Sequence, residues 1–207
     1  MRESVSPKPR PYHHGDLRRA LVEAACRLLD AEGPGALSLR AVAREAGVSP
    51  AAPYHHFKDK GELLDAVAHE GWEKLDEAFQ AAGAEAHGVR DRVVELGVAY
   101  VRFARAHPDL YRIMYDRSRD QADMPEHVHE HEGSAYQRVK TVLLSAGADP
   151  ADEEGLELAT IACWCAAHGL AEMSVFKKFE PLKAALGGEE AFLRGVLGHL
   201  GVYTRHA

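Results

Sequence analysis

The chain has 207 residues, of which 46% are hydrophobic, a length and apolar content that suit one sizeable core or a small module joined to a larger one. Its net charge of −7 excludes a uniformly basic chain, but residues 1–60 hold ten Lys/Arg against seven Asp/Glu, a net of +3, and leave −10 for residues 61–207. This asymmetry predicts a polyanion-binding head on an acidic body.

The first residues, 1–12, are polar and rich in proline. We expect them to form a disordered basic arm rather than a signal peptide, because no apolar stretch follows. The cations Arg2, Lys8 and Arg10 could follow a DNA minor groove, as N-terminal arms do in other DNA-binding proteins. Disorder alone would explain the composition equally well.

Two amphipathic helices are predicted after this arm. From Leu17 to Leu29 apolar residues recur at three- and four-residue steps, which predicts a helix that ends at Gly33-Pro34. Ser38 is expected to cap a shorter helix that continues to Ala46. Gly47 can then take the left-handed conformation that ends a helix.

The stretch GVSPAAPYHHF, residues 47–57, predicts a turn followed by a third helix. Ser49 can cap a helix that begins at Pro50, because proline suits the first helical position. Pro53 removes the first intrahelical bond of such a helix. We therefore expect a two-turn helix whose last turn holds Tyr54–Phe57.

The rest of the chain also has helical periodicity. Asp59 and Glu62 form a capping-box pattern at the start of a helix that runs to about residue 81. Proline and glycine signals separate further predicted helices at 89–107, 108–116, 125–146, 150–179 and 189–203. No segment alternates with a period of two, so the predicted fold class is all-α.

Cysteine usage and hydropathy indicate the compartment. Cys26, Cys163 and Cys165 are odd in number and have no zinc-site spacing, so we expect no disulfide framework and a reducing cytoplasm. The longest uncharged apolar run, 158–171, contains His168 and is too short to span a bilayer. We expect no membrane partner, cofactor or metal.

A helix, a short glycine-containing turn and a second helix in a basic module form the pattern of a helix-turn-helix, which lays its second helix in the DNA major groove. The stretch SLRAVAREAGVSPAAPYHHFKDKGELL, 38–64, resembles the DNA-binding domain of the TetR family of transcriptional regulators. The resemblance covers roughly residues 12–68. Family members usually carry leucine where this chain has Pro53, and often lysine or arginine where it has Pro50.

The resemblance implies a role for individual residues. It places Ser38 and Arg40 on phosphate, Ala51, Ala52 and His55 at base edges, and Tyr54 and Lys60 on the backbone, with Val48 and Phe57 in the core. Helix N-termini bind phosphate, and alanine methyls can sense a thymine methyl. The predicted DNA-binding set is Ser38, Arg40, Ser49, Pro50, Ala51, Ala52, Tyr54, His55 and Lys60.

A second resemblance lies at WCAAHG, residues 164–169, which is similar to the Trp…His-Gly signature of one TetR-family C-terminal domain type. It implies a body that binds a small molecule and dimerises. Side chains from three predicted helices could line an apolar pocket there, although ordinary core packing explains them as well. They are Phe103, Tyr111, Met114, Tyr115, Trp164 and His168.

Two other groups of residues could carry enzyme chemistry. His127 and His131 share a helix face with His129 between them and could bind a metal, or they could lie on a solvated helix start. Cys165 and His168 are three residues apart and could form a thiol–base pair, although such cysteines are more often core residues. A metal- or thiol-dependent enzyme is therefore the alternative, but it leaves the helix-turn-helix unexplained. We expect no catalytic residues.

The sequence thus predicts a basic arm at 1–12, a DNA-binding domain at 13–60 and a ligand-binding and dimerisation domain at 61–207. The resemblance implies a repressor that binds a palindromic operator as a homodimer through its last two helices. Its effector would be a hydrophobic small molecule that releases the DNA by tilting helix 59–81.

Overall fold

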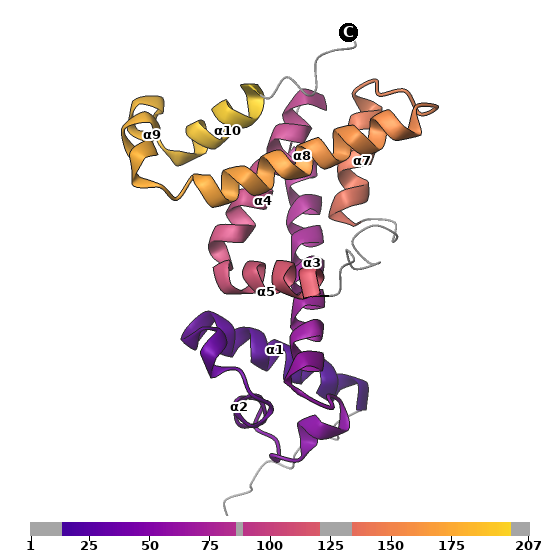
Figure 1. Cartoon of the computed structure of the whole chain (residues 1–207), viewed down its shortest axis with the longest axis vertical. Helices are drawn as coiled ribbons and strands as arrows, with labels where there is room; N and C mark the ends of the chain where they lie inside the picture. The colour runs from indigo at the N-terminus through magenta and orange to yellow at the C-terminus, as the bar shows by residue number, and fades with distance from the viewer. Residues whose placement is uncertain (1–13, 86–88, 121–133, 200–207) are drawn as a thin grey trace, which may run out of the picture. The chain divides into compact units, whose positions relative to one another are not determined.

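The computed structural model describes residues 14–85, 89–120 and 134–199, and every regular element in these ranges is helical (Figure 1). The all-α prediction is confirmed. The chain divides into two compact units, residues 1–67 and 68–207. Helix α3 (Lys60–Glu85) supplies its first residues to the first unit and the remainder to the second.

The first unit is built from α1 (His14–Glu32), a 3-10 turn at Pro34–Ala36, α2 (Leu39–Glu45) and a 3-10 helix, η2 (Ala52–His55). Helix α1 packs on α2, and α2 packs on η2. The predicted apolar stripe of α1 is buried, and the core that it forms with its neighbours contains Leu21, Leu28, Leu29, Leu37, Val42, Phe57 and Leu63.

The caps predicted at Ser38, Gly47 and Asp59 are confirmed. The Ser38 hydroxyl accepts a hydrogen bond from the Ala41 amide at 3.1 Å, and Gly47 has a φ of 70°. The Asp59 carboxylate accepts from the Glu62 amide at 3.0 Å. The Glu62 carboxylate reaches back one residue further than in a standard capping box, to the Lys58 amide at 2.8 Å.

The expected two-turn α-helix from Pro50, capped by the Ser49 side chain, is wrong. The chain forms turns at Pro50–Ala51 and then η2, and no side chain caps it. Pro53 has no amide to offer the Ser49 carbonyl, which instead accepts from Ala52 at 3.0 Å. Three-residue bonds therefore replace four-residue bonds here, because proline removes the donor and disfavours the α conformation before it.

The second unit contains α4 (Val89–Ala106), α5 (Pro108–Asp120), α7 (Ala135–Ser145) and α8 (Glu153–Met173), followed by a 3-10 turn at Lys177–Phe179, α9 (Glu180–Leu186) and α10 (Glu189–His199). Helix α8 lies across α4 and α7, and α10 packs on α4 and α9 (Figure 1).

The predicted bounds of two helices in this unit are wrong. Helix α7 begins at Ala135 rather than at 125, because the Ser134 hydroxyl caps it through the Gln137 amide; residues 125–133 lie outside the described ranges. Helix α8 ends at Met173 rather than at 179. The backbone is extended at Phe176, with ψ of 127°, and the separate helix α9 follows.

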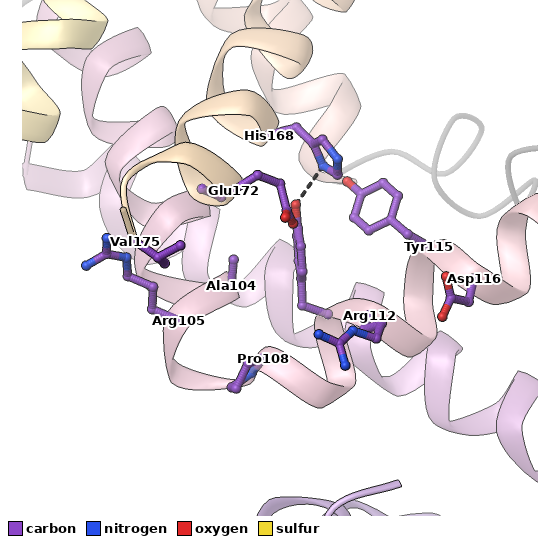
Figure 2. A pocket seen from close by; sticks show the side chains of 11 residues that line it. Ala104, Arg105, Pro108, Arg112, Tyr115, Asp116, His168, Glu172 and Val175 are labelled. Carbon is purple, nitrogen blue, oxygen red and sulfur yellow. Dashed lines mark hydrogen bonds between the residues drawn. The ribbon is translucent and has the colours of Figure 1, made fainter. Parts of the chain in front are cut away.

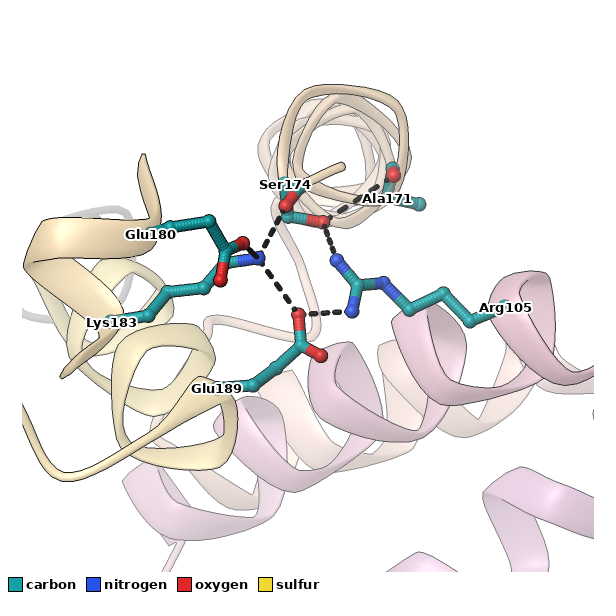
Figure 3. Close-up of polar contacts among 6 residues, drawn as sticks. All are labelled: Arg105, Ala171, Ser174, Glu180, Lys183 and Glu189. Carbon is teal, nitrogen blue, oxygen red and sulfur yellow. Dashed lines mark hydrogen bonds and ion pairs between the residues drawn. The ribbon is translucent and has the colours of Figure 1, made fainter. Parts of the chain in front are cut away.

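A polar cluster at the end of α8 explains why that helix stops (Figure 3). The buried Lys183 ammonium donates to the Ser174 carbonyl at 2.7 Å and to the Glu180 carboxylate at 2.8 Å. Arg105 donates to the Ser174 hydroxyl at 2.8 Å and pairs with Glu189. The Glu180 hydrogen bond is the largest cause that raises the pKa of Lys183. The cluster therefore ties α4, α8, α9 and α10 together.

Helix α8 has one buried and one exposed apolar face. Thr160, Cys163, Ala167 and Leu170 are buried, whereas Leu158, Ile161 and Cys165 are exposed along the opposite side. Within the described residues, no single helix is long and apolar enough to cross a membrane. Helix α8 and the segment 177–186, bent by 96°, meet the length and composition criteria only as a pair.

Candidate functional site

The predicted DNA-contacting residues form one exposed series in the first unit. All of them are exposed except Ala52, which is half-buried, whereas the intervening Leu39, Pro53 and Phe57 are buried. Tyr54 is 53% exposed, which is unusual for a ring that has a core next to it. The exposed candidate DNA contacts therefore alternate along the chain with buried residues that pack into the core of the unit.

Within the described ranges, the cations in and beside this series are unpaired, whereas two arginines on α1 form ion pairs. The side chains of Arg40, Arg44, Lys58 and Lys60 make no hydrogen bond or ion pair with any described residue. On α1, by contrast, Arg19 pairs with Glu23, and Arg27 pairs with Glu45 of α2, both at 3.0 Å. Unpaired cations around η2 suit phosphate binding, because each can replace a counterion.

Sequence reasoning missed Arg44 and Lys58 as candidates. Arg44 lies four residues after Arg40, so the two share a face of α2. Lys58 lies directly after the buried Phe57 and is exposed beside Lys60. The spacing of Arg44 from Arg40 on a Ser38-capped helix was a usable signal. The position of Lys58 was another, because it directly follows Phe57, which the resemblance already placed in the core.

A cavity of about 620 Å³ lies in the second unit, between α4, α5 and the end of α8 (Figure 2). Tyr111, Tyr115 and His168, from the predicted ligand-binding set, line it. The remaining lining residues are Ala104, Arg105, Pro108, Arg112, Asp116, Ala171, Glu172 and Val175. The cavity wall is therefore both aromatic and charged.

The polar atoms of the lining rings are bonded to one another and to neighbouring buried rings. The Tyr111 hydroxyl lies 2.6 Å from Nδ1 of His168, and the Tyr100 hydroxyl lies 3.0 Å from the same atom. Tyr100 also contacts the Tyr115 hydroxyl, which accepts from the Trp164 indole at 3.1 Å. Burial raises the pKa of Tyr100 and Tyr115, so their hydroxyls keep their protons and can donate.

The other predicted ligand-binding residues lie elsewhere. Phe103 and Met114 are buried and do not line this cavity. Trp164 does not line it either, and its ring contacts Tyr100 at 5.4 Å and Trp72 at 6.2 Å between centroids. The Trp and His of WCAAHG thus hold the rings of α4 and α5, and His168 also faces the cavity.

Of the residues proposed for enzyme chemistry, the structure describes only those on α8. His168 directs Nδ1 to tyrosine hydroxyls, while Cys165 is exposed on α8 and Cys163 is buried. Among the described residues, no three His, Cys, Asp or Glu side chains are grouped so as to hold a metal ion. His127, His129 and His131 lie outside the described residues, as does the arm with Arg2, Lys8 and Arg10.

A helix-turn-helix with an exposed face of unpaired cations defines a DNA-binding protein. Residues 21–67 match the family model for bacterial regulatory proteins of the tetR family, and residues 93–197 match that for the tetracyclin repressor-like C-terminal domain. The chain therefore belongs to the TetR family of transcriptional regulators, a class of regulators rather than enzymes. The family resemblance is confirmed, and the enzyme alternative is wrong.

Individual relatives agree with this assignment. The HTH-type transcriptional regulator BetI of Rhizobium meliloti is 40% identical over 79 residues, 38% of this chain and 39% of that relative. An uncharacterized HTH-type transcriptional regulator of Haemophilus influenzae is 52% identical over 62 residues, 30% of this chain and 27% of that relative. The chain thus spans well under half the length of these curated relatives.

Similarity to a solved structure extends over nearly the whole chain. A protein with unknown function from Rhodococcus sp. RHA1 has 30% sequence identity and a TM-score of 0.63, covering 92% of this chain and 95% of that chain. Both units of the chain therefore take part in the likeness.

Proposed function

We propose that the protein is a repressor that binds a palindromic operator as a homodimer and leaves it when a small molecule occupies the cavity. The observation that carries the proposal is that α5, which supplies Tyr111 and Tyr115 to the cavity, is in side-chain contact with α3. Helix α3 in turn begins in the DNA-binding unit. Ligand binding and DNA binding thus share one continuous helix.

The contact between α3 and α5 is close enough to transmit a shift. A Cβ atom at Gly71 of α3 would lie 2.6 Å from Sδ of Met114 on α5. The next residue, Trp72, has its ring centroid 5.4 Å from that of Tyr115. Because tightly packed groups have discrete arrangements, a ligand that displaces Tyr115 would move α3 as well.

The effector that we propose is aromatic but not wholly apolar. The sequence alone suggested a hydrophobic molecule, yet Arg112 and Glu172 line the cavity together with the rings of Tyr111 and Tyr115. Ligand sites of this size combine apolar walls with a few polar groups that fix orientation. The ring faces would supply stacking area, and the charged side chains would supply specificity.

We propose that dimerisation uses α8 and α10, the last long helices. Leu158, Ile161 and Cys165 form an exposed stripe on α8, whose members are three and four residues apart. On α10, Phe192, Leu193 and Leu197 are buried within the subunit, but Gly195 and Gly198 have open space beyond their Cα atoms. Small residues there would let a partner helix approach closely. An obligate interface of this kind buries about 2,000 Å² or more.

Fluorescence anisotropy would test the proposed function. The full-length protein would be titrated against duplex DNA from directly upstream of its own coding region, with and without a panel of aromatic compounds. We expect salt-dependent binding to one palindromic segment and its loss when a compound binds. Equal affinity for every duplex would argue against an operator, and tighter binding with ligand would indicate recruitment instead of release.

Individual DNA contacts can be separated by comparing sequences. Lys60→Ala and Tyr54→Phe should weaken binding to all duplexes by a similar factor, and loss of Lys60 should reduce the slope of log affinity against log salt by about 1. His55→Ala should instead change the preferred base at one position in each half-site. The control is Arg19→Ala on α1, where the cation is already paired with Glu23. Equal losses for His55→Ala and Lys60→Ala on matched and mismatched sites would contradict these roles.

The α3–α5 contact predicts opposite effects for two glycine-to-alanine substitutions. Gly71→Ala should lower the free energy of unfolding by about 1–3 kcal/mol, because the new methyl meets the buried Met114. Gly35→Ala, outside the proposed interface, should raise it by up to about 1 kcal/mol, because nothing lies within 4 Å of its Cβ position, its φ is not positive and alanine loses less backbone freedom on folding. Urea denaturation measures both. Adding Met114→Ala to Gly71→Ala should relieve the overpacking, and a purely additive loss would contradict the contact.

A further inference from the structure

The aromatic wall of the cavity is a continuous surface of ring faces. Ring centroids are 5.0 Å apart for Tyr111 and Tyr115, 4.6 Å for Tyr115 and His168, and 5.6 Å for Tyr111 and His168. The tyrosine hydroxyls and Nδ1 of His168 are bonded within the ring network described above. The three residues therefore offer a ligand mainly the faces and edges of their rings, which favour a planar aromatic group.

Two of the charged side chains that line the cavity remain available to a ligand. Arg105 is bound to Ser174 and Glu189, and Asp116 already has a partner. Arg112 and Glu172 line the same cavity and make no hydrogen bond or ion pair with any described residue. They have opposite charges, yet they do not pair with each other.

Arg112 and Glu172 reach the cavity from two different helices. Arg112 comes from α5 and Glu172 from α8, and Figure 2 draws both with Tyr115 and His168 among the side chains that line the cavity. A molecule placed between them could pair with both at once. A guanidinium favours a carboxylate in two parallel hydrogen bonds, and a carboxylate favours an ammonium group.

We propose that the effector is an amphoteric aromatic molecule, with a ring on Tyr111, Tyr115 and His168, an acidic group on Arg112 and a basic nitrogen on Glu172. This inference rests on the proposed function, because it names the ligand class of the same cavity. A purely apolar molecule would leave both charges unused. A molecule with one charge would use only one of them.

Intrinsic tryptophan fluorescence reports on this site directly. The chain has two tryptophans, Trp72 and Trp164, and both are in ring contact with Tyr115 or with its hydrogen-bonding partners. Displacement of Tyr115 by a ligand should change the indole environment. Binding can thus be measured on the full chain without DNA, so the ligand class and the release of operator are tested separately.

The experiment compares four matched probes: 4-(aminomethyl)benzoate, with both charges, 4-methylbenzoate, 4-methylbenzylamine and p-xylene. We expect the amphoteric probe to bind about fivefold more tightly than either singly charged probe, the scale of one exposed ion pair for each charge. Arg112→Gln should remove its advantage over the amine, and Glu172→Gln its advantage over the acid. Lys177→Gln and Glu154→Gln, which are exposed and outside the cavity, serve as controls.

Several results would overturn the inference. It fails if a singly charged probe or p-xylene binds the wild type as tightly as the amphoteric probe. It also fails if no probe binds while the protein still binds its operator, an outcome that leaves the DNA-binding part of the proposed function intact. Charge-dependent binding that does not release DNA supports the ligand class and contradicts only the release mechanism. Loss of binding in the control variants would contradict the assignment of Arg112 and Glu172.

Discussion

Replacing Ile161 with arginine is expected to convert the protein into a monomer and to weaken operator binding by about two orders of magnitude or more. Ile161 is 44% exposed in the middle of the α8 stripe, between Leu158 and Cys165. In a two-fold interface the same patch occurs on both chains, so each substitution places two cations in one apolar contact. The DNA-binding unit itself is unchanged. Each half-site would then be bound separately, and the advantage of linking two recognition segments would be lost.

A second substitution tests the α10 side of the same interface. Gly198→Arg meets no atom within 4 Å of its Cβ position in the subunit, so it should leave the monomer folded and still abolish the dimer. Thr141→Arg, at an exposed position on α7, is the matched control and should remain dimeric. Analytical ultracentrifugation and operator binding measure the outcome. A monomeric wild type at micromolar concentration, or an intact Ile161→Arg dimer on its operator, would place the interface elsewhere.

Tyr100→Ala is expected to lower the free energy of unfolding by about 3–5 kcal/mol, the usual cost of removing a large ring from a core. Tyr100 is 1% exposed, and its ring contacts those of Phe79, Tyr111, Trp164 and His168. Tyr100→Phe keeps the ring and removes only the hydroxyl that Tyr115 and His168 contact, so it should cost about 1–3 kcal/mol. Tyr54→Phe, at an exposed position, should change stability by less than about 0.5 kcal/mol.

The same residue predicts how stability depends on pH. Burial raises the pKa of Tyr100 above its ordinary value near 10, so folding favours the neutral phenol. Its contribution is therefore fully present below pH 10 and is lost as the pH rises above 10 toward the folded-state pKa. Urea midpoints between pH 8 and 11 should fall more steeply in the wild type than in Tyr100→Phe. Parallel curves would show that the hydroxyl does not titrate with unfolding.

The helix-turn-helix was predictable because its determinants are local. Ser38 caps α2 with an amide three residues away, and Gly47 ends the helix through its own backbone conformation. The apolar period of α1 already indicated which face would be buried. The exception was η2. The sequence showed that Pro53 removes one hydrogen bond. It did not show that the Ser49 carbonyl would instead accept from the Ala52 amide, which makes the segment a 3-10 helix rather than an α-helix.

The end of α8 and the cavity could not be read from local patterns. No glycine or proline marks the point where α8 stops. Its end is set instead by Lys183 and Arg105, which bind Ser174 from other helices. Tyr111 and His168 were both candidate ligand residues, yet they are 57 positions apart, and only packing brings them within hydrogen-bonding distance. Arg112 and Glu172 gave no signal at all. Helix caps and buried helix faces depend on neighbours within one or two turns, so the amino-acid sequence by itself predicts them. The composition of a cavity depends on which helices cross and in what register, and these long-range contacts exist only in the folded chain.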